Sequence, residues 1–198
     1  GNGMEQDYSK AIELEEMGGN TFGFTYLSRA NVKYHIENYI GAIEDYSKAI
    51  ELDIIFNSTF YNRGLCYYIL NKYENAILDF TKAIKLDPAD ELSYYYLGLS
   101  KCYLNEYINA ILDFTKVIEL NGVIDSAIYV DAYYHRGRAK FEIKDFQGGI
   151  TDFSKVIELD ENYGEAYGYR GESKSRIGDF KGAIVDLTDA IWLNPNKL

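Results

Sequence analysis

The chain repeats one eight-residue pattern at a nearly constant distance. The pattern reads DYSKAIEL at 7–14 and again at 45–52, and close variants begin at 79, 113, 152 and 186. From 45 onwards, neighbouring copies start 34 residues apart, except between 113 and 152, where the distance is 39. A period of 34 is typical of units made of two helices, which bury their apolar faces by stacking on one another. The repeat therefore predicts an elongated all-helical array.

The clearest unit, 57–90, shows how such a pair of helices would pack. Small residues stand at Gly64 and Ala76, where two helices can approach closely. Large aromatic side chains such as Phe80 fill the remaining space at helical spacing. Pro88 follows the second helix and cannot continue it. The unit therefore predicts two antiparallel helices joined by a short connection.

These small, large and closing positions resemble the tetratricopeptide repeat family over nearly the whole chain. The resemblance implies an all-α, right-handed superhelical solenoid of antiparallel helix pairs, with five complete repeats after an N-terminal half-repeat. We expect one solenoid domain. Its parts are 1–22 (the second helix of a half-repeat, then a linker), 23–56, 57–90, 91–129, 130–163 and 164–198.

The interval of 39 places five additional residues, Asp125 to Tyr129, in the third repeat. They either lengthen a helix by about one turn or form a loop. We expect a longer first helix that starts near Ser126, because Asp125 and Ser126 are favourable residues for a helix N-cap.

One charged pair recurs without an obvious packing reason. An arginine occupies one position of the first helix and an aspartate one position of the second, and we expect Arg–Asp bridges within or between repeats. The third repeat has Leu97 at the arginine position and should lack the bridge. The alternative is an ordinary charged surface. The residues are Arg29, Arg63, Arg136 and Arg170, with Asp45, Asp79, Asp113, Asp152 and Asp186.

Composition excludes several classes of function. The net charge of −11 would repel phosphate backbones, so we expect no nucleic-acid partner. No stretch is long and apolar enough to enter a membrane as a spanning helix. We also expect no catalytic residue, metal site or cofactor, because the sequence has no nucleophile motif, phosphate loop or paired Cys/His spacing. Cys66 and Cys102 are expected to be buried in helices.

The 20 tyrosines suit helix faces that are half buried and half solvated. In the tetratricopeptide family the first helices line a concave groove, so the resemblance implies a tyrosine-rich groove that holds a peptide or protein segment. The alternative for each tyrosine is packing between neighbouring first helices. The expected groove residues are Asn31, Tyr34, Tyr61, Asn62, Tyr68, Tyr95, Tyr96, Tyr134, His135, Arg138 and Tyr169.

One branch of the family binds the carboxylate ends of chaperone tails through five polar positions. Only Asn31 and Asn62 match that set. The other three positions hold Leu27, Leu92 and Tyr96, which provide no positive charge for a carboxylate. We therefore expect a ligand other than a carboxylate-ended tail.

The two ends favour a second interpretation. The first helix lacks a preceding partner, and Trp192 stands where other repeats have Glu or Lys. The chain is then either a structural segment of a larger protein or a self-associating one, through its terminal helices. The leading expectation remains a non-catalytic interaction scaffold. A cytoplasmic location is expected because no signal is visible, although the N-terminus looks truncated.

Overall fold

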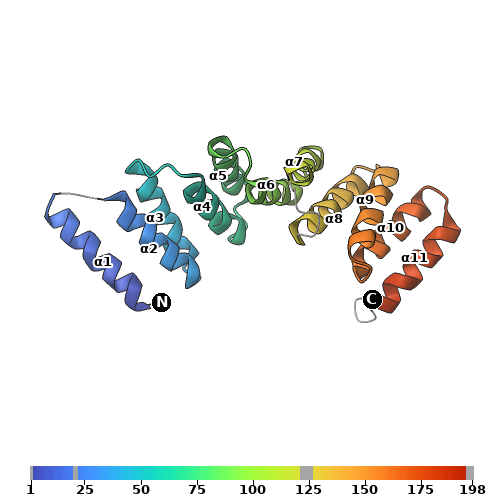
Figure 1. Cartoon of the computed structure of the whole chain (residues 1–198), viewed down its shortest axis with the longest axis horizontal. Helices are drawn as coiled ribbons and strands as arrows, with labels where there is room; N and C mark the ends of the chain where they lie inside the picture. The colour runs from blue at the N-terminus through green and yellow to red at the C-terminus, as the bar shows by residue number, and fades with distance from the viewer. Residues whose placement is uncertain (1, 20–21, 121–126, 195–198) are drawn as a thin grey trace. The chain divides into compact units, whose positions relative to one another are not determined.

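The computed structural model describes residues 2–19, 22–120 and 127–194, which form eleven α-helices and no strand (Figure 1). The all-helical prediction is therefore confirmed. The chain divides into two compact units, Gly1–Ser100 and Lys101–Leu198, and the boundary falls within one helix.

The first unit contains α1 (Asn2–Met17), α2 (Gly23–His35), α3 (Tyr39–Glu51), α4 (Asn57–Ile69), α5 (Tyr73–Leu86) and most of α6 (Glu91–Tyr103). The second unit contains the end of α6, then α7 (Tyr107–Leu120), α8 (Ala127–Glu142), α9 (Phe146–Leu159), α10 (Gly164–Arg176) and α11 (Phe180–Leu193). Consecutive helices pack side by side within each unit, for example α2 on α3 and α10 on α11.

The two helices of each pair are joined by a three-residue turn with a left-handed central residue. That residue has a φ of 62° at Glu37, 56° at Asn71 and 87° at Gly178. Several second helices then begin with a side-chain cap. The Asp145 carboxylate accepts a hydrogen bond from the Gly148 backbone N–H at 2.9 Å, as Asp179 does from Gly182 at 3.0 Å. The short turn reverses the chain and makes the paired helices antiparallel.

Glycine in the first helix permits close contact with the aromatic side chain of the second. A Cβ added to Gly64 would lie 2.9 Å from the Phe80 ring, and one added to Gly137 would lie 2.8 Å from Phe153. Both rings are fully buried. The sequence-based reason for these small residues, close approach of paired helices, is therefore confirmed.

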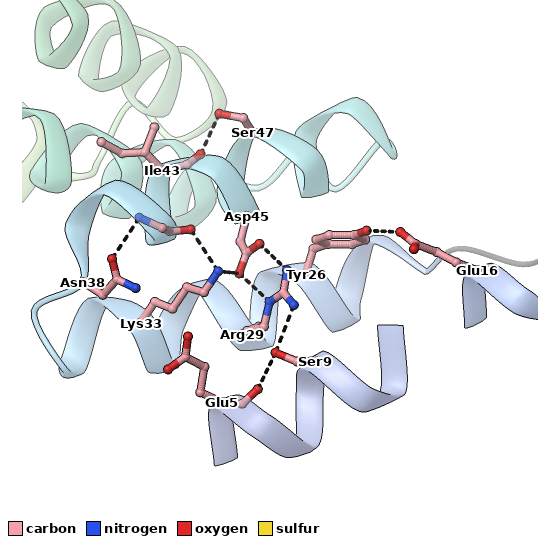
Figure 2. Close-up of polar contacts among 11 residues, drawn as sticks. Glu5, Ser9, Glu16, Tyr26, Arg29, Lys33, Asn38, Ile43, Asp45 and Ser47 are labelled. Atoms are coloured by element: carbon pink, nitrogen blue, oxygen red, sulfur yellow. Dashed lines mark hydrogen bonds and ion pairs between the residues drawn. The ribbon is translucent and has the colours of Figure 1, made fainter. Parts of the chain in front are cut away.

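The predicted Arg–Asp bridges form within repeats. In Figure 2, Arg29 on α2 faces Asp45 on α3, with Nε and Nη2 each 2.7 Å from a carboxylate oxygen. Lys33 adds an ion pair to the same carboxylate at 2.9 Å. The Arg63–Asp79, Arg136–Asp152 and Arg170–Asp186 pairs are bidentate in the same way. Each aspartate is buried, so these bridges are part of the packed interior.

The same arginines also connect neighbouring repeats. Arg29 Nη1 donates to Ser9 Oγ on α1 at 3.1 Å (Figure 2), and Arg63 donates to Ser47 on α3 at 2.9 Å. Arg136 reaches Thr115 and Arg170 reaches Ser154 in the same manner. One guanidinium thus joins three successive helices, both within and between repeats.

The third repeat differs as Leu97 predicts. Leu97 is buried among apolar side chains, and Asp113 instead pairs with Lys101 at 2.6 Å. Burial raises the pKa of Asp113, and this single lysine only partly opposes the shift. At Asp186 burial also favours protonation, but Arg170 and Lys174 together outweigh it and lower the pKa of the carboxyl. Asp186 thus has two cationic partners, an arginine and a lysine, whereas Asp113 has the lysine alone.

Helix α8 has 16 residues, whereas α2, α4, α6 and α10 have 13 each. The expected cap at Asp125 and Ser126 lies outside the described residues. Pro195, which stands near the end of the last repeat as Pro88 does in 57–90, also lies outside them.

Both cysteines should be unreactive in the folded chain. Cys66 is buried as expected, and burial raises the pKa of its thiol to about 12. Cys102 was also expected to be buried but is only partly so, and its partial burial raises the pKa of its thiol to about 11. We expect alkylation of the native chain at neutral pH to be about 100-fold slower than in 6 M guanidinium chloride, because the thiolate is the nucleophile. Mass spectrometry after timed iodoacetamide treatment measures both rates. Rapid labelling of the native chain would contradict the burial.

Candidate functional site

All eleven residues predicted for the groove lie on first helices of their pairs. In the first unit, α2 carries Asn31 and Tyr34, α4 carries Tyr61, Asn62 and Tyr68, and α6 carries Tyr95 and Tyr96. In the second unit, α8 carries Tyr134, His135 and Arg138, and α10 carries Tyr169. Each unit therefore presents its own set.

Tyrosines of the first unit form one aromatic cluster across α4, α5 and α6. The Tyr96 ring stacks on Phe80, with centroids 5.9 Å apart, and meets Tyr61 and Tyr68 edge-on at 6.1 and 5.4 Å. These three tyrosines are half-buried. Burial raises the pKa of Tyr61 well above its ordinary value. The three rings pack between neighbouring repeats, and part of each ring remains accessible. Packing between first helices, the alternative given for each tyrosine, therefore explains part of the tyrosine enrichment.

Asn31 and Asn62 both interact with the buried side chain of Tyr46, a contact that the sequence analysis did not predict. The Tyr46 hydroxyl donates to Asn31 Oδ1 at 2.6 Å. Burial raises the pKa of Tyr46, and a hydrogen bond from Asn62 partly opposes that shift. Tyr46 is fully buried. Both amides therefore have a structural partner, which reduces their capacity to bind a peptide backbone.

In the second unit, Tyr134 is only 8% exposed and lies beneath other rings. Its ring centroid is 4.9 Å from that of Tyr163 and 6.0 Å from that of Tyr169. The Tyr163 hydroxyl also contacts Asp131 Oδ1 at 3.4 Å. Tyr163 and Asp131 were absent from the predicted set. Their polar contact links α8 to the start of α10, a pairing that sequence spacing alone does not reveal.

His135 packs into the interface with the preceding pair. Its ring stacks on Phe114 at 5.8 Å with an interplanar angle of 22°. Burial, with a smaller contribution from the positive charge of Arg138, lowers the pKa of His135 to about 4. The imidazole is therefore neutral at physiological pH and contributes as a flat, mostly buried ring.

Arg138 is exposed and differs from the other arginines. Its guanidinium carbon lies 5.7 Å from the Tyr134 ring centroid and 5.5 Å from that of Tyr169. The remaining five arginines each form an ion pair with a carboxylate, whereas no such pair involves Arg138 within the described part of the chain. Two rings hold the side chain in place by cation–π contact. The guanidinium is therefore exposed but fixed beside these two rings, and Tyr169 also forms a hydrogen bond with it.

Within residues 2–19, 22–120 and 127–194, no group of three or more His, Cys, Asp or Glu side chains could hold a metal ion. None of the helices formed by these residues combines the length and apolarity that crossing a bilayer requires. The first-helix faces carry half-buried rings, phenol hydroxyls and the exposed guanidinium of Arg138.

Comparison with known proteins agrees with this architecture. Residues 58–90 and 130–163 match the tetratricopeptide repeat family. Among curated proteins, no sequence matches the chain. The crystal structure of YrrB, a tetratricopeptide repeat protein with an unusual peptide-binding site, superposes with a TM-score of 0.81 and 23% identity over 96% of this chain and 93% of YrrB.

MamA structures are similar as well. One has a TM-score of 0.80 and 24% identity, covering 88% of this chain and 93% of MamA. MamA of Desulfovibrio magneticus RS-1 has a TM-score of 0.78 and 20% identity, with 88% and 96% covered. At these identities the likeness concerns the fold.

Helix pairs that repeat every 34 residues define a helical repeat protein, whose fold is that of a protein–protein interaction scaffold. Two segments of the chain, 58–90 and 130–163, match the tetratricopeptide repeat family, and the chain shares the fold of the tetratricopeptide repeat protein YrrB.

Proposed function

We propose that the chain is a non-catalytic scaffold that binds a peptide or protein segment on the tyrosine-rich faces of its first helices. The observation that supports the proposal is the partial burial of these tyrosines. Tyr61, Tyr68 and Tyr96 pack on one side and remain partly accessible on the other. Rings already fixed by packing lose little entropy when a ligand binds, which is the property that enriches tyrosine in recognition surfaces.

Arg138 adds a specific polar contact in the second unit. A guanidinium held over Tyr134 and Tyr169 can donate to a carboxylate or a backbone carbonyl of the bound segment. Because it is exposed, it can bind without first breaking an internal ion pair. YrrB, with its unusual peptide-binding site on the same fold, supports a peptide as the type of ligand.

One variant in each unit tests this function. Tyr68→Ala in the first unit and Arg138→Ala in the second remove accessible contacts without disturbing the buried Arg–Asp bridges. We expect each variant to lose most of a bound partner in a pull-down from source-cell lysate read by mass spectrometry. Circular dichroism at 222 nm would establish that both variants keep their helicity.

Matched controls lie on second helices. Leu78→Ala on α5 removes a 66% exposed apolar side chain, and Lys181→Ala on α11 removes an exposed cation. Both should retain the partner. A partner that every variant retains would place binding elsewhere and refute recognition by the first helices for that partner.

Self-association through the terminal helices is the second candidate. It is favoured by exposed apolar side chains at both ends, Met17 at 85% and Trp192 at 84%. Sedimentation velocity over a hundredfold concentration range tests it. A monomer at every concentration would exclude this candidate.

A further inference from the structure

Successive repeats dock on each other through one recurring contact. A planar side chain of the first helix stacks on an aromatic ring of the preceding second helix: Tyr96 on Phe80, His135 on Phe114 and Tyr169 on Phe153. The centroid distances are 5.9, 5.8 and 5.5 Å, and the interplanar angles are 23°, 22° and 20°. Each second-helix ring is fully buried, as is the small residue three positions later: Ala83, Val117 or Val156.

The helices that occupy these docking surfaces share a motif. Three residues before the planar side chain stands a small residue that is fully buried: Ser93 before Tyr96, Ala132 before His135, and Ala166 before Tyr169. The small residue permits close helix approach, and the planar one, one turn away, lies over the second-helix ring. We call that ring and the buried residue three positions after it the floor of the docking surface. The internal packing of the chain therefore shows which helices fit such a docking surface. They carry a small residue and, three positions later, an aromatic one, a pattern that we call the small-x-x-aromatic motif.

The last pair of helices has the same docking surface with nothing upon it in the described residues. The floor positions are Leu187, which is 40% exposed, and Ala190. They belong to a groove of about 670 Å³ between α10 and α11, lined mainly by small and apolar residues. Gly168 lines it at the position that Tyr134 holds one repeat earlier, so no ring fills the space. The remaining lining residues include Gly164, Ile191 and Asn194.

We propose that this groove is a second binding site, which takes an amphipathic helix of a partner protein carrying the small-x-x-aromatic motif. The groove continues the series of helix–helix interfaces that already holds the array together, so its occupant should satisfy the same geometry. The small residue would lie against Ala190 and the aromatic ring over Leu187. This site shares Tyr169 with the first-helix faces proposed above and otherwise uses residues outside the predicted set.

A second copy of the chain is a poorer occupant. Its own small-x-x-aromatic helices are already docked, because Ser93, Ala132 and Ala166 are fully buried inside the fold. The rim of the groove carries Glu165 and Glu172, of which Glu172 is paired with Arg176 at 2.9 Å, so a helix with neutral or basic flanks fits better than an acidic one. The net charge of −11 makes a second copy less suitable on this ground too.

A peptide with the sequence of α6 tests the proposal. Residues 91–103, with Cys102→Ser and a fluorescein label, supply Ser93 and Tyr96 in the required spacing, and their natural docking surface has Ala83 where the groove has Ala190. Fluorescence anisotropy would follow binding to the complete chain up to about 1 mM protein, the range of a weak isolated helix. We expect saturable binding.

Two changes should weaken that binding. Ile191→Glu places a charge on the groove wall, where Ile191 is 50% exposed and contributes little to folding, and should weaken binding at least tenfold. The same loss is expected when the peptide carries Tyr96→Ala. Val185→Glu, also on α11 but not among the lining residues, is the matched control and should bind normally.

Either of two results would overturn the proposal. One is absence of saturable binding up to 1 mM, or binding that Ile191→Glu leaves unchanged. The other is a concentration-dependent dimer in sedimentation velocity that Ile191→Glu abolishes, which would assign the groove to a second copy of the chain. Neither result bears on the first-helix faces, whose test uses Tyr68 and Arg138.

Discussion

Replacing Asp152 with Ala is expected to lower the free energy of unfolding by about 3 kcal/mol. The Asp152 side chain is 1% exposed and binds three donor groups: Arg136 Nε at 3.0 Å, Arg136 Nη2 at 2.7 Å and Lys140 Nζ at 2.8 Å. Without the carboxylate, two largely buried cations lose their partner. Arg136 would also be less well placed to bridge to Thr115 on α7. Urea denaturation followed at 222 nm measures the change.

The chain supplies a graded series for comparison. Asp113→Ala should cost less, because it removes a carboxylate that has one ion-pair partner, Lys101, and an already raised pKa. Glu158→Ala is the control on α9 itself: its side chain is 67% exposed and pairs only with Lys155, so no measurable change is expected. An equal loss in all three variants would show that the effect comes from helix composition, and the buried bridges would then carry no special stability.

The sequence was sufficient to predict the helix pairs and the Arg–Asp bridges, because both depend on positions that recur with the repeat. A residue type that returns every 34 residues must meet the same environment each time. The exception at Leu97 was predictable for the same reason. The lysines were not recognised, although Lys33, Lys101, Lys140 and Lys174 recur four residues after the arginine position, one helical turn away. That spacing was the available signal.

The candidate site was less predictable. First-helix positions were inferred from the resemblance, but whether a side chain there faces solvent depends on the neighbouring repeat. Asn31 binds Tyr46, Tyr134 lies beneath Tyr163 and Tyr169, and Arg138 emerges over two rings. To predict any of these three arrangements, one must know which ring of one repeat lies over which residue of the next. A single sequence does not contain that relation, because many side-chain arrangements are compatible with the same helix period.

A pH dependence centred on His135 is the second large effect that we expect. The ordinary pKa of histidine is about 6.5, and burial, aided by Arg138, lowers that of His135 to about 4 in the folded chain. Between these values the unfolded chain binds a proton that the folded chain does not. Stability contributed by the neutral ring is therefore complete above pH 6.5 and is lost as the pH falls towards 4. The loss should amount to about 2 kcal/mol at pH 4, after allowance for the partial exposure of the ring.

The variant His135→Tyr separates this contribution from the carboxylates that titrate near the same pH. Tyrosine already occupies the equivalent position in two other repeats, where Tyr96 and Tyr169 stack on Phe80 and Phe153, so the variant should fold and pack on Phe114. Urea midpoints at several pH values between 7 and 4 should fall less steeply for His135→Tyr than for the parent chain. His35→Gln changes the exposed histidine of α2 and is the control for the loss of a histidine as such. If the two variants behave alike, the imidazole of His135 is protonated in the folded chain as easily as in the unfolded one, and its burial against Phe114 does not resist charge.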